Sequence, residues 1–146
     1  MGRVKLKLPE QFGFSTEIAI RIGDVNYGGH LGNDTVLALV HEARVQFLKF
    51  YEFKEMDAGG AGFIIVDAVV VYRSQGFYGQ TAKIEVTVGE FSRVGCDFFY
   101  RLCDKESGRE MVRAKTGIVF FDYKRQEVVA VPKLFRTTFA FVEKSK

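Results

Sequence analysis

Near the start of the chain, the spacing of hydrophobic residues changes from that of a strand to that of a helix. Residues 15–23, "STEIAIRIG", alternate polar and apolar side chains, which is the pattern of a half-buried strand. In the following stretch, apolar residues recur instead at helical spacing on one face: Val36, Val40, Ala43, Phe47 and Phe50. These patterns predict a strand and then one long helix, from about residue 33 to about residue 51, capped by Asn33 or Asp34.

Strand patterns dominate the rest of the chain. Four apolar or alternating runs follow one another: "FIIVDAVVVYR" (63–73), "AKIEVTVGEF" (82–91), "CDFFYRLCD" (96–104) and "EMVRAKTGIVFFDY" (110–123). The gaps between them are too short for crossover helices, so we expect an antiparallel meander. The last segment, residues 132–146, is predicted to form a short helix or an edge segment. The fold class is therefore α+β, an antiparallel sheet packed with one long helix.

Length and composition fit a single globular domain spanning residues 1–146. The chain is long enough for a real core, and its hydrophobic fraction of 47% and charged fraction of 27% lie near globular averages. No apolar run is long enough for a signal peptide or a membrane span, so we expect a cytoplasmic protein. Cys96 and Cys103 fall on opposite faces of one predicted strand and are expected to stay reduced.

The charge narrows the classes of ligand. A net charge of +3 suits an anionic ligand, but the basic residues are scattered without a block or stripe, which disfavours nucleic acid. Two isolated histidines without a C-x-x-C motif provide no ligand cluster, so we expect no metal and no other cofactor.

The connection "GDVNYGGHLGND", residues 23–34, carries more polar chemistry than a turn requires. Free backbone N–H groups at a helix start can stabilise an oxyanion, and glycines such as Gly29 let a substrate approach the backbone. The alternative for the glycines is a tight turn between strand and helix. His30 could act as a general base or bind a carbonyl group. Asn26 cannot accept a proton, so it would hold a water or a carbonyl, whereas Asp24 is either a base or an Asx turn that fixes the loop.

The same stretch resembles a known family, the hotdog-fold thioesterases of the 4-hydroxybenzoyl-CoA thioesterase type, including the bacterial acyl-CoA thioesterases of the Tol-Pal gene cluster. Their opening reads roughly R-x-x-D-x-D-x-x-G-H-x-x-N, followed by a helix containing E-A-R. Here "RIGDVNYGGHLGND" and "HEAR" follow that register from Asp24 to Arg44 without a gap. Two later segments, "VYRSQGFYGQTAKIEV" and "RAKTGIVFFDYKRQEVVAVP", are also similar to family strands and turns.

The resemblance implies a hotdog fold, in which an antiparallel sheet wraps around the long helix. It also implies hydrolysis of an acyl-CoA or acyl-carrier-protein thioester by a homodimer or dimer of dimers, with the active site between subunits. The departure from the family that matters most is Asn26, which stands where the catalytic carboxylate, the second Asp of D-x-D, is usual; Gln80 likewise replaces the acid of a family Tyr-Gly-Asp. Plant acyl-ACP thioesterases, a related branch, carry a similar D-V-N followed by a histidine.

Two carboxylates outside the loop are candidates to replace the missing one. Asp67 is the only charge in "GFIIVDAVVVY", and in this fold its strand can face the helix start of a partner subunit. Its alternatives are a place on the solvent face or in a dimer salt bridge. Glu42 matches the family's helix glutamate, but on the helical wheel it lies away from the apolar face, toward an interface or solvent.

An acyl-CoA would need an apolar slot and cations for its phosphates. Tyr27, Phe77 and Tyr78 are candidates for the mouth of the slot, and Arg73 and Arg93 could reach phosphates, although solvated strand-end arginines are the alternative. Gly29 and Asn33, at the helix start, complete the predicted binding residues. The favoured function is an acyl-CoA thioesterase; the alternative is a non-catalytic binder of acyl thioesters or lipid-like ligands on the same fold.

Overall fold

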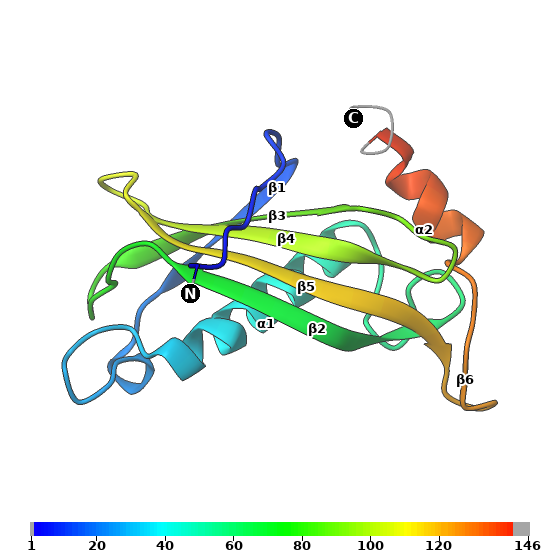
Figure 1. The fold of residues 1–146 in the computed structure, drawn as a ribbon, viewed down its shortest axis with the longest axis horizontal. Coiled ribbons are helices and arrows are strands. Elements are labelled where there is room, and N and C mark those ends of the chain that lie inside the picture. Colours follow the sequence, from blue (N-terminus) through cyan, green and yellow to red (C-terminus); the bar gives the residue numbers. More distant parts are fainter. Residues whose placement is uncertain (1, 142–146) are drawn as a thin grey trace.

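The computed structural model describes residues 2–141 (Figure 1). In chain order the elements are β1 (Phe14–Ala19), a 3-10 turn (Ile22–Asp24), α1 (Asn33–Phe50), β2 (Gly62–Tyr72), β3 (Thr81–Gly89), β4 (Gly95–Asp104), β5 (Glu110–Asp122), β6 (Glu127–Val128) and α2 (Lys133–Thr138). The long helix and the four long strands that follow it begin and end within two residues of their predicted limits. The predictions missed β6, and they extended the first strand into the 3-10 turn.

The strands form one antiparallel sheet in the order β1-β3-β4-β5-β2, with the short β6 paired to the end of β5. The helix α1 runs along one face of this sheet, as Figure 1 shows. This confirms the expected arrangement of a sheet around one long helix. The predicted four-strand meander is wrong at β2: only β3, β4 and β5 pair in succession, whereas β2 pairs with β5 instead of β3 and takes an outer edge. The far end of β2 lies beside the start of β5, where Tyr72 is paired with Val112.

The core lies between α1 and the inner face of the sheet. The buried side of the helix includes the predicted Val36, Val40, Ala43 and Phe47, which confirms the periodicity. Phe50 is the exception, since 63% of it is exposed. It lies in the last helical turn, where its ring meets Phe14 and Tyr51 at the margin of the core instead of being enclosed. In the short helix α2, one of the two forms expected for the last segment, Phe135 is buried; residues 142–146 lie outside the described part.

A polar network crosses the core at the middle of α1. The guanidinium of the buried Arg44 donates to the carboxylate of Glu55 at 2.9 Å and to the hydroxyl of Tyr100 at 3.2 Å. The Tyr100 hydroxyl also bonds to that of Thr116 at 2.7 Å, and His41 contacts Glu55 at 2.8 Å. Arg44, the arginine of the E-A-R motif, therefore fastens the helix to the sheet.

The outer face of the sheet is crossed by the N-terminal strap, residues 2–13. In Figure 1 this segment lies in front of the sheet, on the face opposite α1. Arg113 donates to the backbone carbonyl of Leu6 at 3.2 Å, and the Arg101 guanidinium lies 5.2 Å from the centre of the Phe12 ring. Contacts from β4 and β5 thus hold the strap on the sheet. The two cysteines are free, Cys96 buried and Cys103 partly exposed.

Candidate active site

Asp24 fixes the shape of the segment between β1 and α1, residues 20–32, which we call the junction. Its carboxylate accepts hydrogen bonds from the backbone N–H of Arg21 at 2.8 Å and from the Arg21 guanidinium at 3.2 Å. These bonds from Arg21 lower the pKa of the Asp24 carboxyl. The backbone carbonyl of Asp24 accepts from Gly32 at 3.0 Å, so both ends of the loop are tied to this residue. Only 4% of Asp24 is exposed, and these contacts favour the loop-fixing alternative over a base.

Asn26 shapes the loop with its side-chain oxygen. That oxygen accepts from the backbone N–H groups of Gly28 at 2.9 Å and His30 at 3.3 Å, while the Asn26 N–H donates to the His30 carbonyl at 2.8 Å. Gly29 has a φ of 81°, a conformation that glycine adopts without strain. Because the oxygen is occupied, the Asn26 amide presents its NH₂ group as a donor.

The loop after β2 docks on this junction. Leu31 donates its N–H to the carbonyl of Gly76 at 2.7 Å, and His30 forms an isolated antiparallel bridge with Phe77. The two rings lie edge to face, with centroids 5.2 Å apart. These contacts join two segments that lie more than forty residues apart in the sequence, and they place the end of β2 beside the start of α1.

A cavity of about 410 Å³ opens where the two segments meet. Asn26, His30 and Asn33 line it from the junction, and residues 72–76 line it from the end of β2. The described residues that line this cavity include no carboxylate. The structure therefore brings together the predicted Asn26, His30, Asn33 and Arg73, and it places Asp24, Glu42 and Asp67 elsewhere.

The ring of His30 is partly buried in the cavity wall. Its Nδ1 is buried and has no hydrogen-bond partner among residues 2–141. Leaving a buried polar atom without a partner costs about 1–3 kcal/mol, so such an atom requires an explanation, such as a water, an ion, local strain or a catalytic role. Proton exchange with a bound molecule would then go through Nε2.

The helix start lacks the predicted side-chain cap. Gly32, rather than Asn33 or Asp34, is the N-cap residue, and no side chain bonds to the cap. The carbonyl of Gly32 accepts from Thr35 and Val36, so Asn33 and Asp34 are already the first helical residues. The N–H groups of these two residues have no acceptor in the described part of the chain, and they lie at the positive end of the helix dipole.

Several predicted residues lie outside the cavity. Tyr27 and Tyr78 project into solvent, with exposed fractions of 107% and 63%, and neither is among the residues that line this cavity. Glu42 is exposed, as the helical wheel predicts, and its carboxylate accepts from Gln46 at 2.8 Å. Gly29 lies in the loop but does not line the cavity.

Asp67 forms an ion pair within the described chain. It follows a β-bulge in β2, and one carboxylate oxygen accepts from Lys115 at 2.8 Å and from the N–H of Gly117 at 2.9 Å. The hydrogen bond from Lys115 lowers the pKa of Asp67. The side chain is 56% exposed, so this carboxylate lies at the solvent face, one of its alternatives.

The two arginines assigned to phosphates are far apart. The backbone N–H of Arg73 donates to the carbonyl of Met111, near the start of β5. Arg93 precedes Gly95, which pairs with Val119 near the end of β5, and its carbonyl accepts from the N–H of Val131. Arg73 lines the cavity and Arg93 does not. The two cannot bind the same ligand near the cavity, because they lie at opposite ends of the sheet.

Sequence reasoning missed Tyr72, Ser74 and Gln75, which line the cavity. The Tyr72 hydroxyl donates to the carbonyl of Asn33 at 3.2 Å, which links the end of β2 to the helix start. The available signal was the cluster of polar residues directly after an apolar strand. It was too weak alone, because only the docking of two distant loops gives these residues a common site.

Residues 2–141 contain no group of three or more His, Cys, Asp or Glu side chains placed to hold a metal ion. Within the same range, no helix is long and apolar enough to cross a membrane.

Solved structures share this architecture. The 1,4-dihydroxy-2-naphthoyl-CoA thioesterase Slr0204 from Synechocystis superposes with a TM-score of 0.79 and 18% identity, covering 89% of this chain and 97% of its own. The DHNA-CoA thioesterase from Staphylococcus aureus gives 0.76 and 19%, with coverages of 90% and 89%. The 12:0-ACP thioesterase from Umbellularia californica gives 0.76 and 17%, over 88% of this chain and 50% of its own. At these identities the likeness shows the fold.

The sequence itself also matches a family. Comparison with curated proteins gives no match. The model of the thioesterase-like superfamily, however, matches residues 20–139, which include the junction, α1, the whole sheet beyond β1, and α2. The chain therefore belongs to the thioesterase-like superfamily and has the hotdog fold that its sequence resembles.

Proposed function

We propose that this protein hydrolyses acyl-CoA thioesters in the cavity between the junction and the end of β2. The observation that carries the proposal is the convergence of His30, the Asn26 amide and the free helix start on one cavity. Thioester hydrolysis requires a proton acceptor for water and hydrogen-bond donors where negative charge develops on the carbonyl oxygen. Each of these requirements has a candidate group in the cavity.

The roles follow from the chemistry of the groups. His30 accepts the proton of the attacking water through Nε2, since its Nδ1 is buried. The carbonyl oxygen of the thioester receives hydrogen bonds from the Asn26 NH₂ group and from the free N–H groups at the start of α1. Collapse of the tetrahedral intermediate then releases the CoA thiolate, which takes up a proton, and the free acid.

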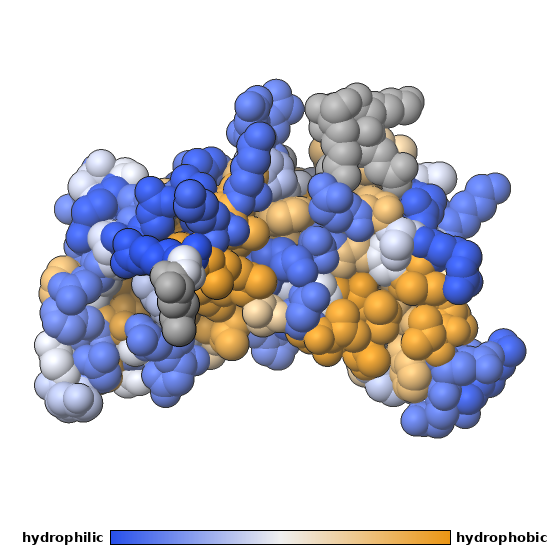
Figure 2. Space-filling model, viewed as in Figure 1, coloured by the Kyte–Doolittle hydropathy of each residue, from blue (hydrophilic) through white to orange (hydrophobic). Residues whose placement is uncertain are grey.

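The proposal includes a homodimer that completes the site. The edge strand β2 carries exposed apolar side chains, including Ile65 at 43% and Val66 at 55%, and its last residue, Tyr72, lines the cavity. Figure 2 shows hydrophobic residues gathered over the half of the sheet that lies toward β6. A long apolar edge strand with unpaired backbone groups favours association with another strand. A second copy pairing along β2 would border the cavity and bring its own carboxylates near it, Asp67 among them.

Substitution of the edge tests the dimer. Val66→Lys should shift the protein from dimer to monomer in analytical ultracentrifugation, because a charge on an edge strand opposes strand pairing. Val128→Lys is the matched control, since Val128 is 51% exposed on the short β6. A wild type that sediments as a monomer at assay concentrations would remove the dimer from the proposal.

The alternative is a non-catalytic binder of acyl thioesters, favoured by the amide at Asn26 where the family usually has a carboxylate. Release of free thiol from short, long and aromatic acyl-CoAs separates the two functions. Hydrolysis of any of them by the wild type supports the enzyme. If no acyl-CoA is hydrolysed while acyl-CoA still binds in calorimetry, the binder is correct.

A further inference from the structure

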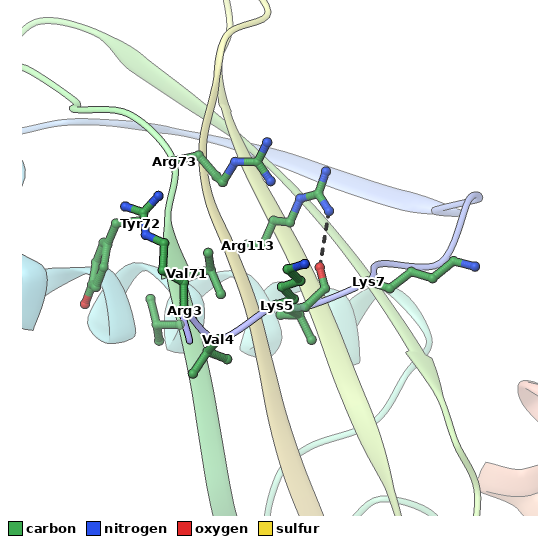
Figure 3. Close-up of a pocket in the computed structure, with 10 residues that line it drawn as sticks. Arg3, Val4, Lys5, Lys7, Val71, Tyr72, Arg73 and Arg113 are labelled. Carbon is green, nitrogen blue, oxygen red and sulfur yellow. Dashed lines mark hydrogen bonds between the residues drawn. The ribbon is translucent and has the colours of Figure 1, made fainter. Parts of the chain in front are cut away.

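A second cavity, of about 860 Å³, lies between the N-terminal strap and the end of β2. Residues 3–7 of the strap line one side, and Val70, Val71, Tyr72, Arg73 and Arg113 line the other (Figure 3). We call it the strap groove. The strap precedes the segment that matches the superfamily, residues 20–139, so the groove has a wall that the family match does not include.

The strap groove carries a surplus of positive charge. Five cationic side chains line it: Arg3, Lys5, Lys7, Arg73 and Arg113. Glu110 offsets part of this charge, since its carboxylate lies 2.8 Å from Arg113 and 3.8 Å from Arg73. The three cations of the strap form no ion pair within residues 2–141. Like charges confined to a concave surface focus a positive potential, which attracts an anion with several charges.

The groove also has apolar walls and a connection to the candidate active site. Val4 and Leu6 of the strap face a cavity lined by Val70 and Val71 of β2. Tyr72 and Arg73 line both the strap groove and the cavity that contains His30. A ligand whose anionic part lies in the groove can therefore extend past the end of β2 to the candidate active site.

We infer that the strap groove binds the phosphorylated nucleotide of the thiol carrier, so that the protein selects coenzyme A over an acyl carrier protein. This inference rests on the proposed function. Arginine and lysine side chains suit phosphate groups, and the valines offer an apolar wall to a purine base. The volume lies within the range of about 300–1,000 Å³ that is typical of small-molecule sites, whereas a carrier protein docks on a broad surface.

Binding of the nucleotide alone tests the groove without any hydrolysis. The probe is adenosine 3′,5′-bisphosphate, titrated by calorimetry into the full chain at low and moderate salt. The double variant Arg3→Glu/Lys5→Glu should weaken binding at least about tenfold, since it replaces two attractive charges with two repulsive ones. The control Lys124→Glu/Lys133→Glu makes the same change in charge beyond the opposite end of the sheet, and its affinity should stay within about twofold. No binding by the wild type, or equal loss in both variants, would overturn the inference.

Kinetics then test the link to the active site. With acyl-CoA, Arg3→Glu/Lys5→Glu should raise KM about tenfold or more and leave kcat unchanged, because the nucleotide is remote from the reacting atoms. With the same acyl group on N-acetylcysteamine, which lacks the nucleotide, wild type and variant should not differ. Unchanged KM for acyl-CoA, or a loss that appears only with acyl carrier protein, contradicts the inference and leaves the proposed hydrolysis standing. Conversely, the wild type could bind the nucleotide, and lose this binding in Arg3→Glu/Lys5→Glu, yet hydrolyse no thioester. That result would refute the proposed hydrolysis and support the nucleotide site.

Discussion

Two groups of polar side chains lie against α1, and they differ in how far their hydrogen-bonding capacity is used. At the middle of the helix, Arg44 is bonded to Glu55 and Tyr100, and Tyr100 is bonded to Thr116. At the start of the helix, the Nδ1 of His30 is buried without a partner among the described residues. Arg44 and His30 both belong to the motif that resembles the thioesterases, yet only His30 lines the cavity at the start of α1.

The difference separates structural from chemical residues within one motif. A buried polar network whose members are bonded to one another stabilises a unique packing, and a ligand would have to break it to use its atoms. Free N–H donors and a histidine ring that lines a cavity remain available to a substrate. Motif membership alone therefore does not identify a catalytic residue; the state of its hydrogen bonds in the fold distinguishes the two cases.

The largest expected effect comes from the two histidines of the chain. His30→Ala should lower kcat for acyl-CoA hydrolysis by about 10²–10⁴-fold, since it removes the proposed general base. His41→Ala is the control, because His41 is exposed and contacts Glu55 away from the cavity. Its rate should stay within about twofold of wild type. Similar losses in both variants, measured by thiol release on folded protein, would contradict the assignment of His30.

Arg44→Met should act on stability instead. Only 7% of the Arg44 side chain is exposed, and its removal leaves the Glu55 carboxylate and the Tyr100 hydroxyl without their cation. Breaking one partner of a buried pair costs about 3 kcal/mol or more, measured as the free energy of unfolding in urea. Arg125→Met, which breaks the exposed pair with Glu127, should cost less than about 1 kcal/mol. Equal losses would show that the network contributes no more than a surface ion pair.

Asn26 both shapes the loop through its side-chain oxygen and offers its NH₂ group to the cavity, and two substitutions distinguish these roles. A carboxylate in Asn26→Asp can accept the same N–H bonds from Gly28 and His30, so the melting temperature should be kept, whereas Asn26→Ala should lower it. Both variants lose the amide donor, and kcat should fall by about 10²-fold in each. An Asn26→Asp variant as active as wild type would show that the amide NH₂ group is not used.

The smallest effect concerns pH. The pKa of Asp24 is lowered in the folded protein by its hydrogen bonds to Arg21, so the carboxylate stabilises the fold above its unfolded pKa, and this contribution is lost as pH falls through the folded value. The wild type should therefore lose thermal stability below about pH 4, and Asp24→Asn should show a flatter acid dependence from a lower starting value. Parallel acid curves for the two proteins in calorimetry would argue against this linkage.

Asp67→Asn shows the same linkage at an exposed site, where solvent weakens it. Its pKa is also lowered, chiefly by the bond from Lys115, but more than half of the side chain is exposed. Its acid dependence should change less than that of Asp24→Asn. The variant also tests the dimer, because a collapse of turnover with retained stability would identify Asp67 as the base across the interface.

The parts of the fold that depend on neighbours in sequence could be predicted. Val36, Val40, Ala43 and Phe47 fixed the buried face of α1 through their spacing, and alternation located the long strands. The local motif also pointed to Asn26, His30 and Asn33, which the structure brings to one cavity. Even locally, the cap was wrong, because the backbone of Gly32 caps the helix while bonded to Asp24.

The set of elements and the family to which they belong follow from the order of residues alone, because periodicity and motif order are properties of residues close in the chain. Which polar groups are hydrogen-bonded and which stay free depends instead on contacts between distant segments of the chain. Asp67 finds Lys115 across a strand pair, Arg44 finds Tyr100 across the core, and Tyr72 reaches Asn33 at the helix start. These partners are separated by 39 to 56 residues, so their meeting depends on how the sheet packs against α1.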